Sequence, residues 1–280
     1  VDPMPTHAFD RSIGLVALRR LLPLFAAGLI PVACRTPDSP GPDGIVTPRE
    51  TIHLFNGKDL STFDTWLEGP HGFTDPDKVF TVLGDVGGAP AIRVSGQHMG
   101  GLLTKREYAN YRLVLEYRWG EKTWGGREKA ARDNGVLLHC QGPEGAVQKD
   151  FRGPWMRSVE LQIIEGGVGD LLLVPGYDKD GVQHKPRVTA RAKQDRDGEW
   201  AFDPQGEPRD FEAFARVNWW GRDVDWKDSL GFRGAKDLDG PHGQWTRLEA
   251  VCDGDSLAYF VNGQLANAAV KCSQPHGRLL

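Results

Sequence analysis

Residues 158–165 read SVELQIIE, and this stretch decides the fold prediction. Apolar residues alternate with Glu160 and Gln162, which is the period-two pattern of a β-strand with one buried face. The pattern places Glu160 and Gln162 together, facing a groove or solvent, and puts the apolar residues between them in a core. Regular alternation would put Glu165 on the core side, unless a bulge or the end of the strand turns it around.

The same alternation recurs along the chain after residue 50. Glycine, proline, aspartate or asparagine bounds each stretch, and Asn262-Gly263 is the strongest hairpin signal because it suits a type I′ turn. The 35 glycines and 19 prolines fit many short strands better than a helical bundle. We therefore predict an all-β protein over residues 50–280, a two-sheet antiparallel jelly-roll sandwich. The other predicted strands lie within residues 111–119, 135–140, 170–174, 246–252 and 256–261.

The composition excludes several classes of protein. Of 280 residues, 39% are hydrophobic and 26% are charged, which is the balance of a globular protein with a real core. The formal net charge is -4 and no long basic run occurs, so nucleic acid is not an expected partner. Residues 179–244 mix charges, glycines and tryptophans without a clear period, and we predict a long loop insertion there.

Residues 1–34 resemble a bacterial export signal. Arginines precede an apolar run of 13 residues that ends at Cys34, and this run is shorter than the roughly 20 residues that a membrane-spanning helix needs. Ala33-Cys34 resembles the end of a lipobox, so lipidation of Cys34 and simple cleavage near Ala33 both stay open. Residues 35–49 are rich in proline and glycine and are predicted as a flexible linker. The expected location is the periplasm or, through a lipid anchor, the outer membrane.

Three cysteines follow the predicted signal, at Cys140, Cys252 and Cys272. An oxidising compartment could pair two of them, and Cys252 with Cys272 is the preferred pair. Three buried thiols are an equally good interpretation, because no spacing of cysteine and histidine indicates a zinc site.

Polar side chains on two other predicted strands could share a groove with Glu160. Glu116 and Arg118 fall on one face of residues 111–119, and His139 ends the strand that begins at residue 135. Side by side, these strands would present a carboxylate, a guanidinium and an imidazole, a set that can move protons and stabilise an anion. The alternative is that Glu116 and Arg118 form a surface ion pair and that His139 is a core histidine.

With these residues in place, the sequence resembles the 3-keto-disaccharide (3-keto-glycoside) hydrolase family, which is abundant among exported bacterial proteins. The resemblance implies a concanavalin A-like jelly roll that acts on a glycoside already oxidised to a ketone at C3. The family usually adds a strand after the position of Gly277-Arg278, so a closing strand is predicted to be missing. The motifs that carry the resemblance are LFNGKDL at 54–60, GLLT at 101–104, EYRW at 116–119, NGVLLH at 134–139, ELQI at 160–163 and GQW at 243–245.

The resemblance also implies a reaction. A ketone at C3 acidifies the hydrogen on C2, so a base removes that proton, the group at C1 leaves by β-elimination, and water adds back. Glu160 is assigned as the base, His139 as the acid or the partner of the enolate oxygen, and Arg118 as the anion stabiliser. The ketone would come from a sugar 3-dehydrogenase acting upstream. No cofactor is established by the sequence, and a divalent cation held by these carboxylates stays open. Sugar contacts are expected from Glu116, Asn134, Trp155, Gln162 and Glu165.

Two other functions stay open. Residues 160–165 also resemble the catalytic strand of laminarinase-type retaining glucanases, with Gln162 in place of an aspartate, and that function needs a bulge that brings Glu165 within about 5–5.5 Å of Glu160. A lectin-like binding module would hold glycan without turnover and would use tryptophans as stacking surfaces. The tryptophans expected in that role are Trp155, Trp219 and Trp220.

Overall fold

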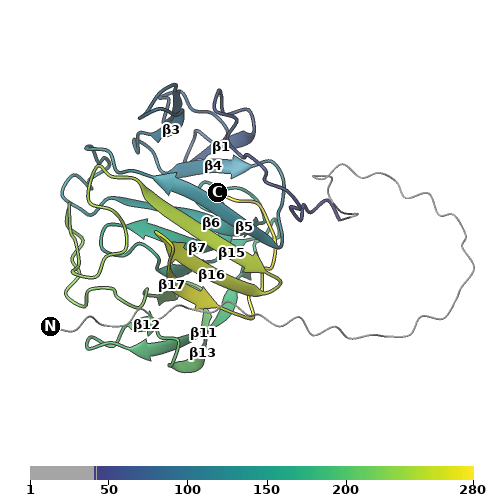
Figure 1. Cartoon of the computed structure of the whole chain (residues 1–280). Coiled ribbons are helices and arrows are strands. Elements are labelled where there is room, and N and C mark those ends of the chain that lie inside the picture. Colours follow the sequence, from purple (N-terminus) through teal and green to yellow (C-terminus); the bar gives the residue numbers. More distant parts are fainter. Residues whose placement is uncertain (1–40, 42) are drawn as a thin grey trace, which may run out of the picture. The chain divides into compact units, whose positions relative to one another are not determined.

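The structure, a computed structural model, describes residue 41 and residues 43–280 (Figure 1). These residues form 17 β-strands and no helix, so the prediction of an all-β antiparallel sandwich is confirmed. Accordingly, no helix in this described part is long and apolar enough to cross a membrane. The predicted export signal over residues 1–34, with its lipidation site at Cys34, lies outside the described residues.

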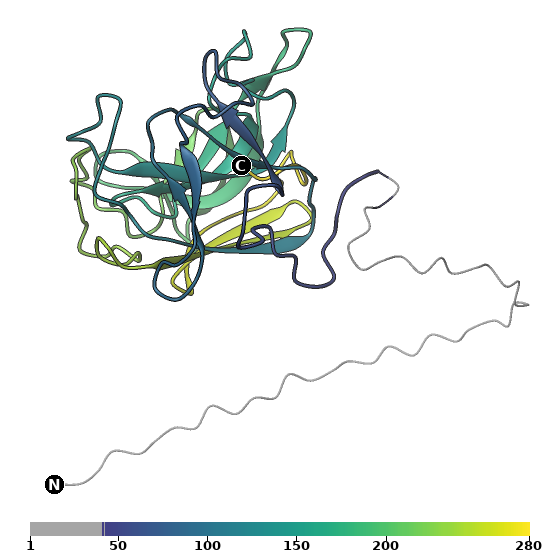
Figure 2. The same cartoon turned by 90° about the horizontal axis from the view of Figure 1, so that it is seen from above.

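Two four-stranded antiparallel sheets make up the sandwich, and we call them the front sheet and the back sheet. Figure 2 shows them as separate layers, with the yellow strands of the back sheet apart from the teal and green strands of the front sheet. The front sheet has the order β14 (Arg216–Val217), β8 (Leu171–Val174), β7 (Arg157–Ile164) and β6 (Asp133–Gln141). The back sheet has the order β17 (Gln264–Ala269), β16 (Ser256–Val261), β15 (Thr246–Asp253) and β5 (Tyr111–Tyr117).

The core fills the space between the two sheets. Leu161 and Ile163 of β7 belong to the same buried apolar cluster as Leu248 and Ala250 of β15. Each strand presents alternate residues to the facing sheet, so period-two sequences are the ones that can build this core. Because these residues of β7 face the core, Glu160 and Gln162, which alternate with them, lie on the outer face of the front sheet.

The prediction of a loop insertion over residues 179–244 is wrong in part, because strands β10 to β14 lie there. Val188, Ala190 and Ala192 alternate along β11 and are buried. Alanine gives a weak hydrophobic signal, so the surrounding charges concealed the period of this strand. A separate sheet of order β12-β11-β13 results, with β12 at Trp200–Phe202, β11 at Arg187–Gln194 and β13 at Glu207–Glu212.

The remaining strands form three two-stranded pairs. In Figure 1, β1, β3 and β4 lie at one end of the sandwich and β11, β12 and β13 lie at the opposite end. The pairs are β1 (Phe63–Leu67) with β4 (Gly100–Thr104), β2 (Phe80–Leu83) with β3 (Ala91–Val94), and β9 (Gly176–Tyr177) with β10 (Gln183–His184).

Segments near both ends of the described chain form β-bridges with Tyr108. Val46 forms a parallel bridge with Tyr108 and is fully buried in the core, so the linker prediction is wrong for this residue. On the other side, Gly277 forms an antiparallel bridge with Tyr108, and Arg278 bridges Cys140 of β6. The backbone of Leu280 also exchanges hydrogen bonds with Leu137. The C-terminal residues therefore cover the edge of β6.

The three described cysteines are free and buried, so the preferred pair of Cys252 with Cys272 is not formed in the structure. Burial raises the pKa of Cys140 and of Cys252 to about 12. These thiols therefore stay protonated at neutral pH and behave as small apolar core residues.

Candidate active site

Glu160 lies in a cross-strand row on the outer face of the front sheet. It pairs with Leu137 of β6 on one side and with Leu172 of β8 on the other, and Leu172 pairs in turn with Arg216 of β14. Residues that are directly paired project to the same face of a sheet, so Arg216 and Glu160 share the outer face. The carboxyl group of Glu160 has no hydrogen-bond partner among the described residues, and the side chain is only partly exposed.

Gly135 makes room for the Glu160 side chain. A Cβ atom placed on Gly135 would lie 1.9 Å from Glu160 Oε1, which is far inside contact distance. The carboxyl group therefore extends over the backbone of β6 at the one position in that strand without a side chain. This places it toward Asp133, which lies two residues before Gly135 on the same face of β6.

Asp133 is held by a hydrogen bond and by a neighbouring positive charge. Gln162 Nε2 donates to Asp133 Oδ1 over 2.5 Å, and Arg127 Nη2 lies 3.9 Å from Asp133 Oδ2. The Asp133 side chain is 37% exposed. Glu160, Gln162 and Asp133 thus lie along one open face, with the amide of Gln162 fixing the orientation of the second carboxyl group.

The environment raises the pKa of both carboxyl groups. Burial raises the pKa of Glu160 to about 8, the charge of Asp133 acts in the same direction, and Arg216 opposes the shift. Burial also raises the pKa of Asp133, against the opposing charges of Arg127 and Arg216. Carboxyl groups tuned in this way are suited to proton transfer near neutral pH.

A hollow of about 2630 Å³ opens at these residues. Trp155 forms part of its apolar wall, where the indole packs with Leu280 on a buried cluster that includes Leu137 and Met156. An aromatic wall beside a few polar groups is the usual make-up of a small-molecule site. Trp155 and Gln162 both line the hollow, although Gln162 is only 4% exposed and its amide is bound to Asp133, and their roles as sugar contacts stay predictions.

His139 does not join this site. The strand β6 has a bulge between Leu138 and Gln141, and His139 has a positive φ of 55° there. The bulge turns the imidazole into the interior, where it is fully buried, its Nδ1 lies 2.6 Å from the Gln274 carbonyl oxygen, and its ring packs edge-on against Tyr111. Burial lowers the pKa of His139 to about 4, so it is a neutral core histidine at neutral pH.

Glu116 and Arg118 are not on the strands that neighbour Glu160. Glu116 lies on β5 and Arg118 directly follows it, and β5 pairs with β15 in the back sheet rather than with β6 or β7. Glu116 is opposite Arg247 on the outer face of that sheet, and Arg118 lies over the ring of Trp245 at 5.0 Å from its centroid. Both side chains nevertheless line the same large hollow as Glu160. The predicted role of Arg118 as anion stabiliser therefore stays a prediction.

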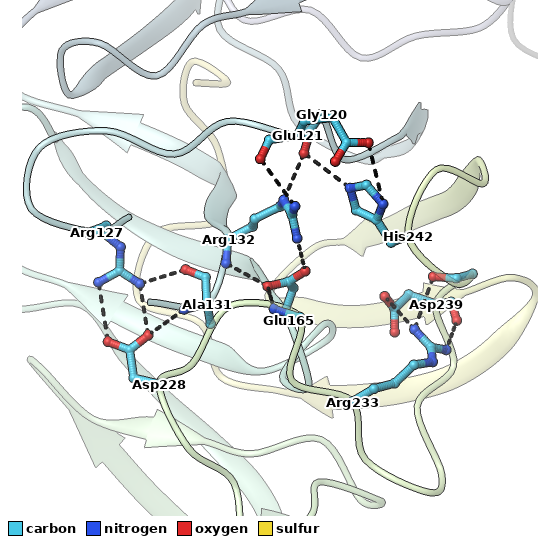
Figure 3. Close-up of polar contacts among 12 residues, drawn as sticks. Gly120, Glu121, Arg127, Ala131, Arg132, Glu165, Asp228, Arg233, Asp239 and His242 are labelled. Atoms are coloured by element: carbon cyan, nitrogen blue, oxygen red, sulfur yellow. Dashed lines mark hydrogen bonds and ion pairs between the residues drawn. The ribbon is translucent and has the colours of Figure 1, made fainter. Parts of the chain in front are cut away.

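Glu165 is a structural residue. Its carboxylate accepts hydrogen bonds from Arg132 Nη1 at 2.6 Å, from the Arg132 amide at 2.9 Å and from the Gly231 amide at 2.8 Å. Figure 3 shows Arg132 between Glu165 and the loop that carries Gly120 and Glu121. With only 6% of its side chain exposed, Glu165 is occupied by this ion pair, which does not suit a sugar contact or the nucleophile of a retaining pair.

The structure also places Asn134, a predicted sugar contact, on a different face from Glu160. It pairs with Ile163, whose side chain faces the core, so it lies on the face of β6 opposite to Glu160. Its side-chain oxygen accepts the amide hydrogen of Gly135 over 2.7 Å. The expected role of Asn134 as a direct partner of the Glu160 groove is not supported by this position.

Sequence reasoning missed Asp133, Gly135 and Arg216. Gly135 stands in the motif 134–139 that was noted for His139, Asp133 directly precedes this motif, and their alternation with Leu137 was the available signal. Arg216 gave no such signal, because its strand, β14, has only two residues and shows no alternation in the sequence. Among the described residues there is no group of three or more histidine, cysteine, aspartate or glutamate side chains arranged to hold a metal ion.

A β-sandwich with two carboxyl groups and an aromatic wall in a hollow on one sheet face has the features of a glycoside-acting enzyme. The family comparison gives the same class. The model of the 3-keto-alpha-glucoside-1,2-lyase-like domain matches residues 50–279, and the chain belongs to that family. No curated protein matches the chain significantly.

Two solved structures from Parabacteroides distasonis resemble the chain, and each carries a provisional name as a glycosyl hydrolase. The first is 14% identical with a TM-score of 0.38, and the match covers 81% of this chain and 83% of the other. The second is 14% identical with a TM-score of 0.29, and the match covers 64% of this chain and 72% of the other. At these TM-scores neither resemblance carries weight for the fold or the function.

Proposed function

We propose that the protein cleaves 3-keto-glycosides by elimination followed by hydration, with Glu160 as an essential carboxyl group. The observation that carries this proposal is the partly buried, unpartnered carboxyl of Glu160, with a raised pKa, on the open face of the front sheet. Membership of the lyase-like family supports the substrate class. No cofactor is needed, because the ketone at C3 already provides the acidity at C2.

The groove residues suit the charge that develops in this reaction. Loss of the C2 proton creates an enolate whose negative charge rests on the C3 oxygen. Arg216, in the same cross-strand row as Glu160, is the guanidinium that we assign to that oxygen in place of Arg118. Trp155 would pack against the apolar face of the sugar ring, and Gln162 would hold Asp133 in place.

The proposal also has consequences outside the site. A ketone at C3 must be made by oxidation of the C3 hydroxyl, so a sugar 3-dehydrogenase is the expected upstream partner. Export to the periplasm, with or without lipidation at Cys34, stays a prediction. The upstream enzyme and the location concern where the substrate is made and used, and they do not bear on the chemistry at Glu160.

The deciding experiment measures turnover of a methyl 3-keto-glucoside beside the unoxidised methyl glucoside, for the wild type and for Glu160→Gln. We expect release of methanol from the keto substrate alone and a loss of at least about 100-fold in the variant. Glu207→Gln, an exposed carboxyl at the start of β13, is the matched control and should keep full activity. Thermal unfolding of each variant shows that it is folded.

The rival functions give different results in the same assay. A retaining glucanase would cleave the unoxidised substrate, and a lectin-like module would bind both sugars without turnover. Either result would overturn the proposed function.

A further inference from the structure

Elimination needs a second proton-transfer group. In an α-glycoside the hydrogen on C2 and the oxygen on C1 lie on opposite faces of the ring, so one carboxyl cannot both take the C2 proton and protonate the leaving oxygen. His139 was the predicted second group, but it is buried in the core with its Nδ1 on the Gln274 carbonyl. The second group must therefore come from the groove itself.

Asp133 is the carboxyl group that the groove offers. It lies on the same outer face as Glu160, and the Glu160 carboxyl extends over Gly135 toward it. Asp133 is reachable by a ligand, because 37% of its side chain is exposed.

The hydrogen bonds of the two carboxyl groups show which one keeps the proton. Asp133 accepts a hydrogen bond from the Gln162 amide, and the Arg127 guanidinium is 3.9 Å away, so its ionised form is stabilised. Glu160 receives no donor from the described residues and is partly buried, so its neutral form is favoured. The two groups titrate as a coupled pair.

Other charges also act on the two carboxyl groups. Arg127 is itself paired with Asp228, at 3.1 Å between Nη2 and Oδ1, and is thereby kept next to Asp133. Arg216, whose Nη1 is 3.8 Å from Asp170 Oδ2, favours the ionised form of both Asp133 and Glu160 and so does not distinguish them. Asp228 raises the pKa of Asp133, and the two guanidinium groups oppose it.

We propose that Asp133 and Glu160 are an acid–base pair that holds one proton, with Asp133 as the base at C2 and Glu160 as the acid at the leaving oxygen. This inference rests on the proposed function and reverses the base role first assigned to Glu160. The ionised Asp133 takes the proton from C2, and the electrons of that bond form the enolate. The enolate then re-forms the C3 ketone, a C1–C2 double bond forms, the C1–O bond breaks, and the departing oxygen takes the proton of Glu160.

Hydration returns both groups to their starting state. Water adds to C1 while the Glu160 carboxylate takes its proton, and Asp133 gives its proton back to C2. The sum of the two steps is hydrolysis of the glycoside without oxidation or reduction. The same two residues thus exchange roles in the second half of the reaction.

The test uses two 3-keto-glucosides that differ in the group at C1, one carrying methoxide and one carrying 4-nitrophenolate. Nitrophenolate leaves without protonation, so loss of the acid should harm only the methyl substrate. For Glu160→Gln we expect a loss of about 100-fold or more with the methyl substrate and less than about 10-fold with the nitrophenyl substrate. For Asp133→Asn we expect losses of at least about 100-fold with both.

Exchange of the C2 hydrogen with deuterated water, followed by NMR on the methyl substrate, gives an independent measurement. Glu160→Gln should keep this exchange and Asp133→Asn should lose it. Asp225→Asn, at an exposed carboxyl group that pairs with Arg196 on the surface, is the matched control and should show neither selective loss. The opposite pattern between the two carboxyl variants, or full activity in Asp133→Asn, would overturn the assignment. If the wild type turns over neither keto substrate, the proposed function itself fails.

Discussion

At the residue scale, the environment of a carboxyl group decides what it can do. Glu160, Asp133 and Glu165 all belong to neighbouring strands or strand ends, yet each has a different set of partners. Glu165 receives three donors and is a structural anion. Glu160 receives none and favours the protonated form, whereas Asp133 is held by an amide and faces a guanidinium. Proton transfer is therefore expected from Glu160 and Asp133, which receive fewer hydrogen bonds than Glu165.

The pH profile of the reaction should reflect this pair. We expect kcat/KM to rise as Asp133 ionises and to fall above about pH 8, as Glu160 loses its proton. The sign follows from the roles, because the base must be ionised and the acid must be protonated. Steady-state kinetics from pH 4 to 10 checks this, and Glu160→Gln should lose the alkaline limb. A profile that only rises up to pH 9 would instead assign Glu160 as the base.

Gly135→Ala should harm catalysis more than folding. The new methyl group would lie 1.9 Å from Glu160 Oε1, so the carboxyl must move away from its position over β6. We expect kcat to fall by about 100-fold, because small displacements of a reacting group have effects of that order. Gly84→Ala is the control, since a Cβ there meets nothing within 4 Å. Unchanged kcat in Gly135→Ala would contradict the position assigned to Glu160.

At the element scale, local irregularities decide which strand residues reach the groove. The bulge in β6 removes His139 from the face that its alternation predicts, because the extra residue shifts the side-chain period by one. Gly277 approaches this bulge so closely that a Cβ on it would lie 2.4 Å from the His139 carbonyl carbon. The C-terminal segment therefore packs closely against the bulge. The bulge directs His139 into the core, so this histidine is not part of the site.

The ion pair of Arg132 with Glu165 should matter for stability and not for chemistry. Glu165→Gln would leave the buried Arg132 guanidinium, 8% exposed, without its counter-charge. We expect the free energy of unfolding to fall by roughly 3 kcal/mol, measured by urea denaturation, with the folded fraction still active. Asp225→Asn breaks the exposed pair with Arg196 and should cost less than about 1 kcal/mol. A stable but inactive Glu165→Gln would revive the glucanase interpretation.

At the scale of the whole molecule, distant segments complete the sandwich. Val46 and Gly277 bridge Tyr108 from opposite sides, so segments more than 200 residues apart meet at one place. Leu280 then packs on the cluster that carries Trp155, next to the groove. The C-terminal residue Leu280, which helps to complete the sandwich, therefore also supports the Trp155 wall of the candidate site.

Val46→Ala tests this closure from the N-terminal side. Val46 is fully buried, and removing two methyl groups there should lower the free energy of unfolding by about 2 kcal/mol. Turnover by the folded protein should be unaffected, because Val46 is on the core side. Val182→Ala, at a residue that is 55% exposed, is the control and should be neutral in the same denaturation experiment. Equal stabilities of the two variants would contradict a core role for Val46.

The period-two pattern by itself determined the all-β fold, the core face of β7 and the outward position of Glu160 and Gln162, because alternation is a local property of a strand. The family motifs, likewise local, indicated the substrate class. Only the tertiary structure decided which strands are neighbours, and it put Glu116 in the back sheet, Arg118 directly after the end of β5, and His139 in the core. Pairing between distant strands and the bulge in β6 depend on contacts across the chain, so residues such as Arg216 and Asp133 joined the site only once the sheet was formed.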